Sequence, residues 1–96
     1  MAYEVKITKN FKKNVALCKR RGYPMDLLRE ALDILIDTGT LPEKYCPYKL
    51  QGNHAGEWEA HIAPNWLITW EQNDDELILL MLSTRTHSDL FGKKRC

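Results

Sequence analysis

The chain has 96 residues, of which 44% are hydrophobic and 28% are charged, and its formal net charge is +1. This composition is typical of a globular protein, and the length predicts a single domain over residues 1–96 with one core. No apolar run approaches the roughly 20 residues that a membrane-spanning helix needs, and the first residues contain no apolar signal segment. The sequence therefore argues against a membrane protein, and we expect a cytoplasmic one.

The N-terminal part of the chain predicts one strand and two helices. Residues 3–8 alternate between polar and apolar side chains, which indicates a strand. A helix with one apolar stripe follows and ends at Gly22. A second helix begins at Pro24 and ends at Gly39, with a wide apolar face. The two helices are expected to form a hairpin that buries this face.

The C-terminal half predicts an antiparallel meander. Strands are expected at residues 57–62, 66–71 and 77–82, separated by short turns. The third strand is apolar on both faces, so we expect it to be central. Residues 41–55 form a connecting loop with a short strand around 48–50. The predicted class is α+β: an N-terminal strand at a sheet edge and a helix hairpin packed on one face of a small antiparallel sheet.

Alternation also predicts which polar residues the strands present. Trp58, Ala60 and Ile62 share one face of their strand, so Glu57, Glu59 and His61 share the other. His87 comes just after the predicted central strand. The other candidates stand at strand ends or turns, and they are Tyr48, Lys49, Asn65, Trp66, Arg85 and Phe91.

Two histidines beside cationic and aromatic side chains suit RNA cleavage without a metal. One group takes the proton of a ribose 2′-hydroxyl, which attacks the neighbouring phosphate, and a second group protonates the departing 5′-oxygen. Histidine fits both roles because its ordinary pKa lies near neutrality. Lysine or arginine stabilises the charged phosphoryl group, and aromatic rings stack on bases. No spacing of His and Cys resembles a metal motif, so neither a metal nor another cofactor is expected.

Two sequence segments identify a family resemblance. Residues 60–66 read AHIAPNW and residues 86–92 read THSDLFG. With the Leu-Gln-Gly at residues 50–52, they resemble YafQ toxins of the RelE/ParE superfamily of bacterial toxin–antitoxin systems over nearly the whole chain. The resemblance implies an endoribonuclease that cuts mRNA in the A site of the 70S ribosome without a metal, and a cognate antitoxin that neutralises it.

The resemblance also implies roles for single residues. His87 matches the principal catalytic histidine and would be the general acid. His61 would be the base or a phosphate ligand. Trp66 and Phe91 match aromatic positions that would hold bases.

The chain departs from the family pattern at three places. Tyr48-Lys49 stands where relatives commonly have His-Pro, and Asn65 stands where they commonly have aspartate. The arginine before the last histidine is shifted by two residues, to Arg85, which keeps it on the same face of an extended chain. Tyr48 is a poorer base than histidine because its ordinary pKa is near 10, and Asn65 cannot act as one. Arg85, Lys49, Tyr48 and Asn65 remain candidates for binding RNA and its phosphates.

Two alternatives stay open at this point. A protein of the same fold could act without catalysis, by binding a protein target such as gyrase. A catalytically degenerate toxin could be retained for antitoxin binding, given the changes at Tyr48 and Asn65.

Overall fold

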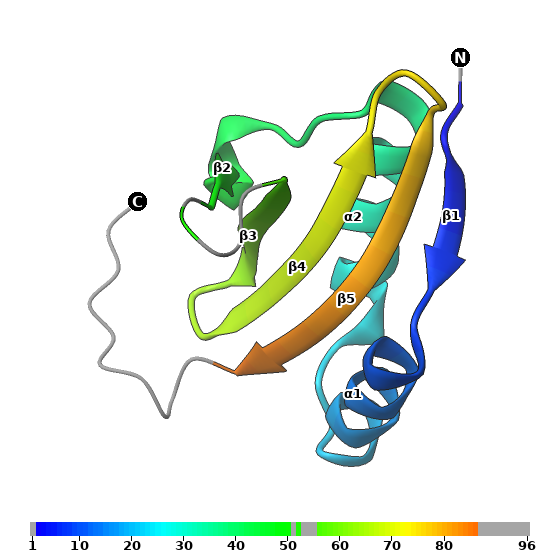
Figure 1. Ribbon diagram of the computed structural model, residues 1–96. Coiled ribbons are helices and arrows are strands. Elements are labelled where there is room, and N and C mark those ends of the chain that lie inside the picture. Colours follow the sequence, from blue (N-terminus) through cyan, green and yellow to red (C-terminus); the bar gives the residue numbers. More distant parts are fainter. Residues whose placement is uncertain (1, 51, 53–55, 87–96) are drawn as a thin grey trace.

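A computed structural model describes residues 2–50, 52 and 56–86 of the chain (Figure 1). The elements, in chain order, are β1 (Glu4–Ile7), α1 (Lys9–Arg20), α2 (Met25–Thr38), the short 3-10 helix η1 (Glu43–Tyr45), β2 (Tyr48–Lys49), β3 (Glu57–Ala63), β4 (Trp66–Asn73) and β5 (Ile78–Thr86).

The strands form one sheet in the order β1-β5-β4-β3-β2. β2 to β5 pair antiparallel, whereas β1 runs parallel to β5 at the edge. The predicted edge position of the first strand and the inner position of the strand beginning near Leu77 are therefore confirmed.

β5 is longer than the sequence analysis predicted. It continues past Leu82 to Thr86, and Arg85 is paired with Leu67 of β4. The prediction ended this strand where the apolar run ended, but backbone pairing with β4 does not depend on apolar side chains. Arg85 thus belongs to a strand and not to a connecting segment.

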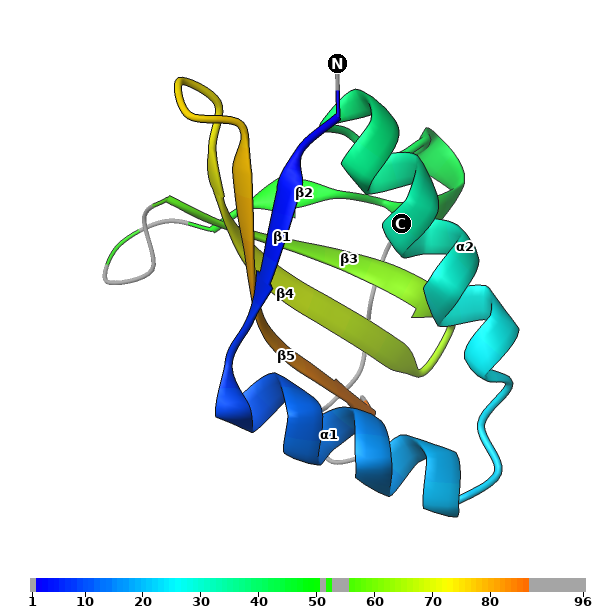
Figure 2. The ribbon, with the colours of Figure 1, turned by 90° about the vertical axis from the view of Figure 1, so that its right-hand side faces the viewer.

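The two helices take different positions against the sheet. α2 runs along the back of the sheet in Figure 1, and α1 lies at its lower end, so the helices diverge in Figure 2 instead of lying side by side. Thr8 caps α1 by accepting a hydrogen bond from the Phe11 backbone N–H at 3.1 Å. None of the helices in the described ranges is long and apolar enough to cross a membrane.

α1 also covers the edge of β5 beyond the end of β1. The β1 pairing stops at Met81. From there Asn10 donates from Nδ2 to the Leu82 carbonyl at 3.0 Å, and Asn14 accepts from the Thr84 backbone N–H at 3.1 Å. The helix side chains therefore satisfy backbone groups that an open edge would leave to solvent.

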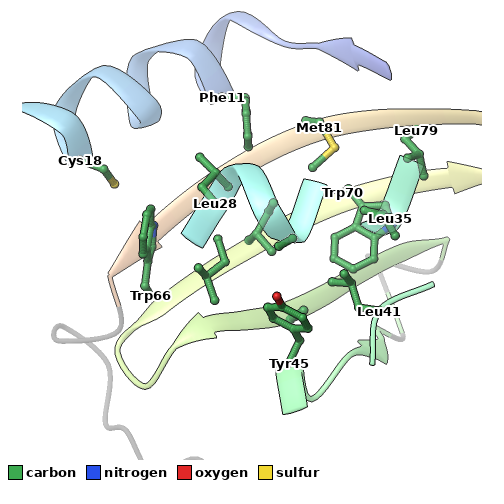
Figure 3. Close-up of a cluster of buried hydrophobic side chains, with 14 residues drawn as sticks. Phe11, Cys18, Leu28, Leu35, Leu41, Tyr45, Trp66, Trp70, Leu79 and Met81 are labelled. Carbon is green, nitrogen blue, oxygen red and sulfur yellow. The ribbon is translucent and has the colours of Figure 1, made fainter. Parts of the chain in front are cut away.

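The hydrophobic core lies between the helices and the back of the sheet (Figure 3). Trp66 and Trp70 of β4 are its largest side chains, each 1% exposed. Thr84 is buried beside Trp66, accepts from its indole Nε1 at 2.8 Å, and donates to the Leu67 carbonyl at 2.8 Å. The hydroxyl thus has both partners that a buried polar group requires.

Gly39 offers a stability test of the packing between α2 and the N-terminus. Its φ is +77°, and a Cβ built there would lie 2.5 Å from Cε1 of Tyr3. Gly39→Ala is expected to lower the free energy of unfolding by about 2–4 kcal/mol, because it adds a steric clash to backbone strain.

Gly22 is the matched control for that substitution. Its φ is +83°, but a Cβ there would meet nothing within 4 Å. Gly22→Ala should lower the free energy of unfolding by about 1–2 kcal/mol, because it adds backbone strain without a steric clash. Urea unfolding of both variants measures the difference, and equal losses would show that the approach of Tyr3 adds nothing.

Candidate active site

The face of the sheet opposite α2 carries two rows of side chains from neighbouring strands. Side chains of directly paired residues in antiparallel strands point to the same face. The first row is Tyr48, Glu59, Thr69 and Ser83. The second row is His61, Leu67 and Arg85. The face contains His61, Tyr48 and Arg85, three of the predicted site residues.

A groove of about 430 Å³ lies on this face, between the strands and α1. Its lining includes Glu59 of β3, Thr69 of β4, Arg85 of β5 and Asn14 of α1. The groove therefore places an exposed guanidinium and a half-buried carboxylate on the same surface. We refer to it below as the β-face groove.

Tyr48 and Glu59 form a hydrogen-bonded pair at one side of this face. The Tyr48 hydroxyl donates to Oε1 of Glu59. Burial raises the pKa of Tyr48 to about 12, and the hydrogen bond to Glu59 and the charge of Glu59 act in the same direction. The phenol is therefore protonated at neutral pH and cannot serve as a base. The stabilisation from this pair is fully present below pH of about 10 and is lost as the pH rises toward the pKa of Tyr48.

The Tyr48–Glu59 pair can be tested by titration. Subtracting the ultraviolet tyrosinate signal of Tyr48→Phe from that of the wild type isolates Tyr48, which should ionise with a pKa of about 12. Glu59→Gln should lower this pKa without restoring the ordinary value, because the amide removes the charge and burial remains. An unchanged pKa in Glu59→Gln would contradict the pairing.

Two of the predicted phosphate and RNA ligands lie elsewhere. Lys49 points to the other side of β2, and its Nζ lies 5.7 Å from the ring centroid of Trp58. Asn65 is exposed in the turn between β3 and β4 and lines a separate pocket of about 350 Å³ with Tyr23 and Pro24. The structure does not bring either side chain into the β-face groove.

Trp66 is a core residue, and its geometry does not support base stacking. Its ring is 1% exposed and meets the ring of Tyr23 edge-on at 5.1 Å between centroids. As the first residue of β4 it points to the helix side of the sheet, so both ring faces are covered by protein. The sequence motif identified the residue but could not show which face it would occupy.

His87 and Phe91 lie outside the described residues. His87 follows β5 directly in the sequence, two positions after Arg85. Their predicted roles remain predictions.

Glu59 is the residue that sequence reasoning did not single out. Alternation placed it on the same face as His61, but a glutamate on a strand face is usually a solvated residue. The pairing of β2 with β3 places Tyr48 directly opposite Glu59, although the two residues are separated by a loop in the sequence. No local pattern in the sequence specifies that pairing.

Comparison with known proteins places the chain in a family. Residues 3–92 match the family model described as "Bacterial toxin of type II toxin-antitoxin system, YafQ". The mRNA interferase toxin YafQ of Escherichia coli strain K12 is 31% identical over 90 residues, which cover 93% of this chain and 96% of that protein.

Solved structures agree with this assignment. The toxin in the E. coli DinJ–YafQ toxin–antitoxin complex has a TM-score of 0.82 at 29% identity, covering 96% of this chain and 100% of that one. A metal-bound toxin from Helicobacter pylori has a TM-score of 0.80 at 25% identity, covering 95% of this chain and 100% of that one. The predicted α+β fold is confirmed. The prediction of an endoribonuclease is confirmed at the level of the family, because the YafQ proteins of two Escherichia coli strains are named mRNA interferase toxins. The chain belongs to the YafQ family of bacterial type II toxin–antitoxin toxins.

Proposed function

We propose that this toxin cleaves mRNA in the A site of the ribosome by attack of a ribose 2′-hydroxyl on the adjacent phosphate. The observation that carries the proposal is the placement of Arg85 and His61 on the same sheet face, where Arg85 lines a groove and stands two residues before His87 in the sequence. The family membership supports the same reaction class.

The spacing of the two side chains suits a phosphodiester. His61 and Arg85 flank Leu67 in the register of β3, β4 and β5. Neighbouring strands are about 4.8 Å apart, so the two backbones are roughly 10 Å apart. The Arg85 side chain is exposed and long enough to reach a phosphate on this face, whereas both ring nitrogens of His61 are buried. The Arg85 guanidinium would stabilise the charge that develops on the phosphoryl oxygens. His61 would serve as a second phosphate ligand.

The reaction yields a 2′,3′-cyclic phosphate and a free 5′-hydroxyl. The 2′-oxygen forms a bond to phosphorus and loses its proton, while the bond from phosphorus to the 5′-oxygen breaks. His87 as imidazolium would donate the proton that the departing 5′-oxygen requires. Phe91 would stack on a base of the bound mRNA.

Two partners belong to this proposal. The ribosome would hold the mRNA in place for cleavage in the A site. A cognate antitoxin would neutralise the toxin, as the E. coli relative has been crystallised in complex with DinJ. We also infer that the protein acts in the cytoplasm, where translating ribosomes are found.

Mapping of RNA 5′-ends in cells expressing the toxin tests this proposal. New 5′-hydroxyl ends should appear inside translated reading frames, and a reporter whose start codon has been removed should stay intact. Arrested growth with intact mRNA would support the alternative of a toxin that binds a protein target. Unimpaired growth without antitoxin would support the degenerate alternative.

A further inference from the structure

The proton acceptor of the reaction is the part of the site where this chain departs from the family pattern. Asn65 carries an amide and lies in another pocket, and the Tyr48 phenol stays protonated at neutral pH. Among the described residues of this sheet face, His61 and the carboxylates remain as groups that could take the 2′-hydroxyl proton.

Glu59 occupies the position that such a group needs. It lies next to His61 in the same strand, two residues away and on the same face, which separates their backbones by about 7 Å. It lines the β-face groove together with Arg85 and Ser83. A carboxylate oxygen can accept a proton, as the role of general base requires.

We propose that Glu59 is the general base that activates the ribose 2′-hydroxyl, and that Tyr48 is the positioning residue that holds its carboxylate. The inference rests on the proposed mRNA cleavage. Oε2 of Glu59 takes the proton from the 2′-hydroxyl as the 2′-oxygen bonds to phosphorus. The electron pair of the breaking bond leaves with the 5′-oxygen, which receives its proton from the general acid.

The Tyr48 hydrogen bond explains how one oxygen of the carboxylate is left for substrate. Tyr48 donates to Oε1 and so fixes the orientation of the group from the β2 side. Such fixation matters because a general base acts only within hydrogen-bond reach of the proton it removes.

Among the described residues, the charged groups that line the groove are the carboxylates of Glu57 and Glu59 and the guanidinium of Arg85. Glu57 and His61 flank Glu59 on β3, Tyr48 faces it from β2, and Arg85 approaches from β5. β4 and α1 contribute uncharged groups to the groove, through Thr69 and the side chains of Asn10 and Asn14. Arg85 would bind the phosphate from the β5 side of the groove, while Glu59 lines the groove from the β3 side.

The first test is the single-turnover rate of cleavage of ribosome-bound mRNA by Glu59→Gln. The amide keeps the size of the side chain and can still accept from Tyr48, but it cannot take a proton. The rate should fall by about 10²–10⁴-fold. The cleavage rate of Tyr48→Phe should fall by only roughly 3–10-fold, with unchanged binding to ribosomes. This variant loses the hydrogen bond that orients the Glu59 carboxylate but keeps the carboxylate itself.

A modified substrate separates the base from the acid. An mRNA with sulfur in place of the bridging 5′-oxygen at the cleaved bond has a leaving group that needs no protonation. This substrate should restore the cleavage rate of His87→Ala, whereas its cleavage by Glu59→Gln should remain slow. On this substrate the wild-type cleavage rate should no longer rise with pH above a pH of about 6, as expected for a carboxylate base. With an imidazole base, the rate would still rise with pH in that range. This measurement on the wild type holds even if the variant does not fold.

Glu71→Gln is the matched control, because Glu71 pairs with Glu57 on the same face but lies outside the β-face groove. It should cleave within about twofold of the wild type, the range expected of a surface change away from the site. Cleavage by Glu59→Gln within about threefold of the wild type would overturn the assignment, since a general base contributes at least about 10²-fold. Rescue of Glu59→Gln by the sulfur substrate would also overturn it. Absence of cleavage by the wild type would instead refute the proposed function itself.

Discussion

Replacing His87 with alanine is expected to abolish growth arrest and to slow mRNA cleavage by about 10²–10⁴-fold. The proposed chemistry requires a proton for the departing 5′-oxygen, and alanine cannot provide one. Colony formation on induction without antitoxin gives the first readout. Single-turnover cleavage of ribosome-bound mRNA gives the rate.

The third histidine of the chain supplies a control for His87. His54→Ala removes an imidazole to which no role is assigned and should leave growth arrest unchanged. Binding of both variants to the antitoxin checks that each is folded. Growth arrest that survives intact in His87→Ala would refute the role of this residue as general acid.

Replacing Arg85 with alanine is expected to lower the cleavage rate by about 10²–10³-fold, with little change in thermal stability. Arg85 is exposed at the end of β5 and lines the β-face groove, so its loss removes charge from the site without opening the core. Arg85→Lys should recover part of the rate, because lysine keeps the charge but not the two-pronged donor geometry.

The control for Arg85 is Arg29→Ala on α2, an exposed arginine on the helix side of the sheet. It should cleave within about twofold of the wild type, as a surface substitution away from the site. A similar loss in both variants would show that general electrostatic attraction to the ribosome accounts for the effect. Full activity of Arg85→Ala would place the phosphate elsewhere.

The sequence predicted the elements well because their signals are local. Alternation along β3 gave the correct face for His61, and Gly39 marked the end of α2, where its φ is positive. The apolar run of β5 also predicted an inner strand, and β5 lies between β1 and β4 in the sheet. The arrangement of α1 along the β5 edge was missed because Asn10 and Asn14 bond to backbone groups that are distant in the sequence.

The candidate site was predicted less completely for a related reason. Lys49 and Tyr48 are neighbours in the sequence, yet β2 turns one toward Trp58 and the other toward Glu59. Trp66 carried a recognisable motif, but its burial follows from packing against Tyr23. Glu59 gained a role only from a pairing between strands. Non-local register decides these assignments, and sequence spacing alone does not contain it.

The central claim is that this toxin cuts mRNA on the ribosome, and one reconstituted reaction tests it most directly. Purified toxin is mixed with 70S ribosomes that hold an mRNA with a chosen codon in the A site, and with the same mRNA alone. The prediction is cleavage within the A-site codon, only on the ribosome, with 2′,3′-cyclic phosphate and 5′-hydroxyl ends. Intact mRNA on the ribosome over a range of A-site codons, with toxin that still arrests growth, would contradict it.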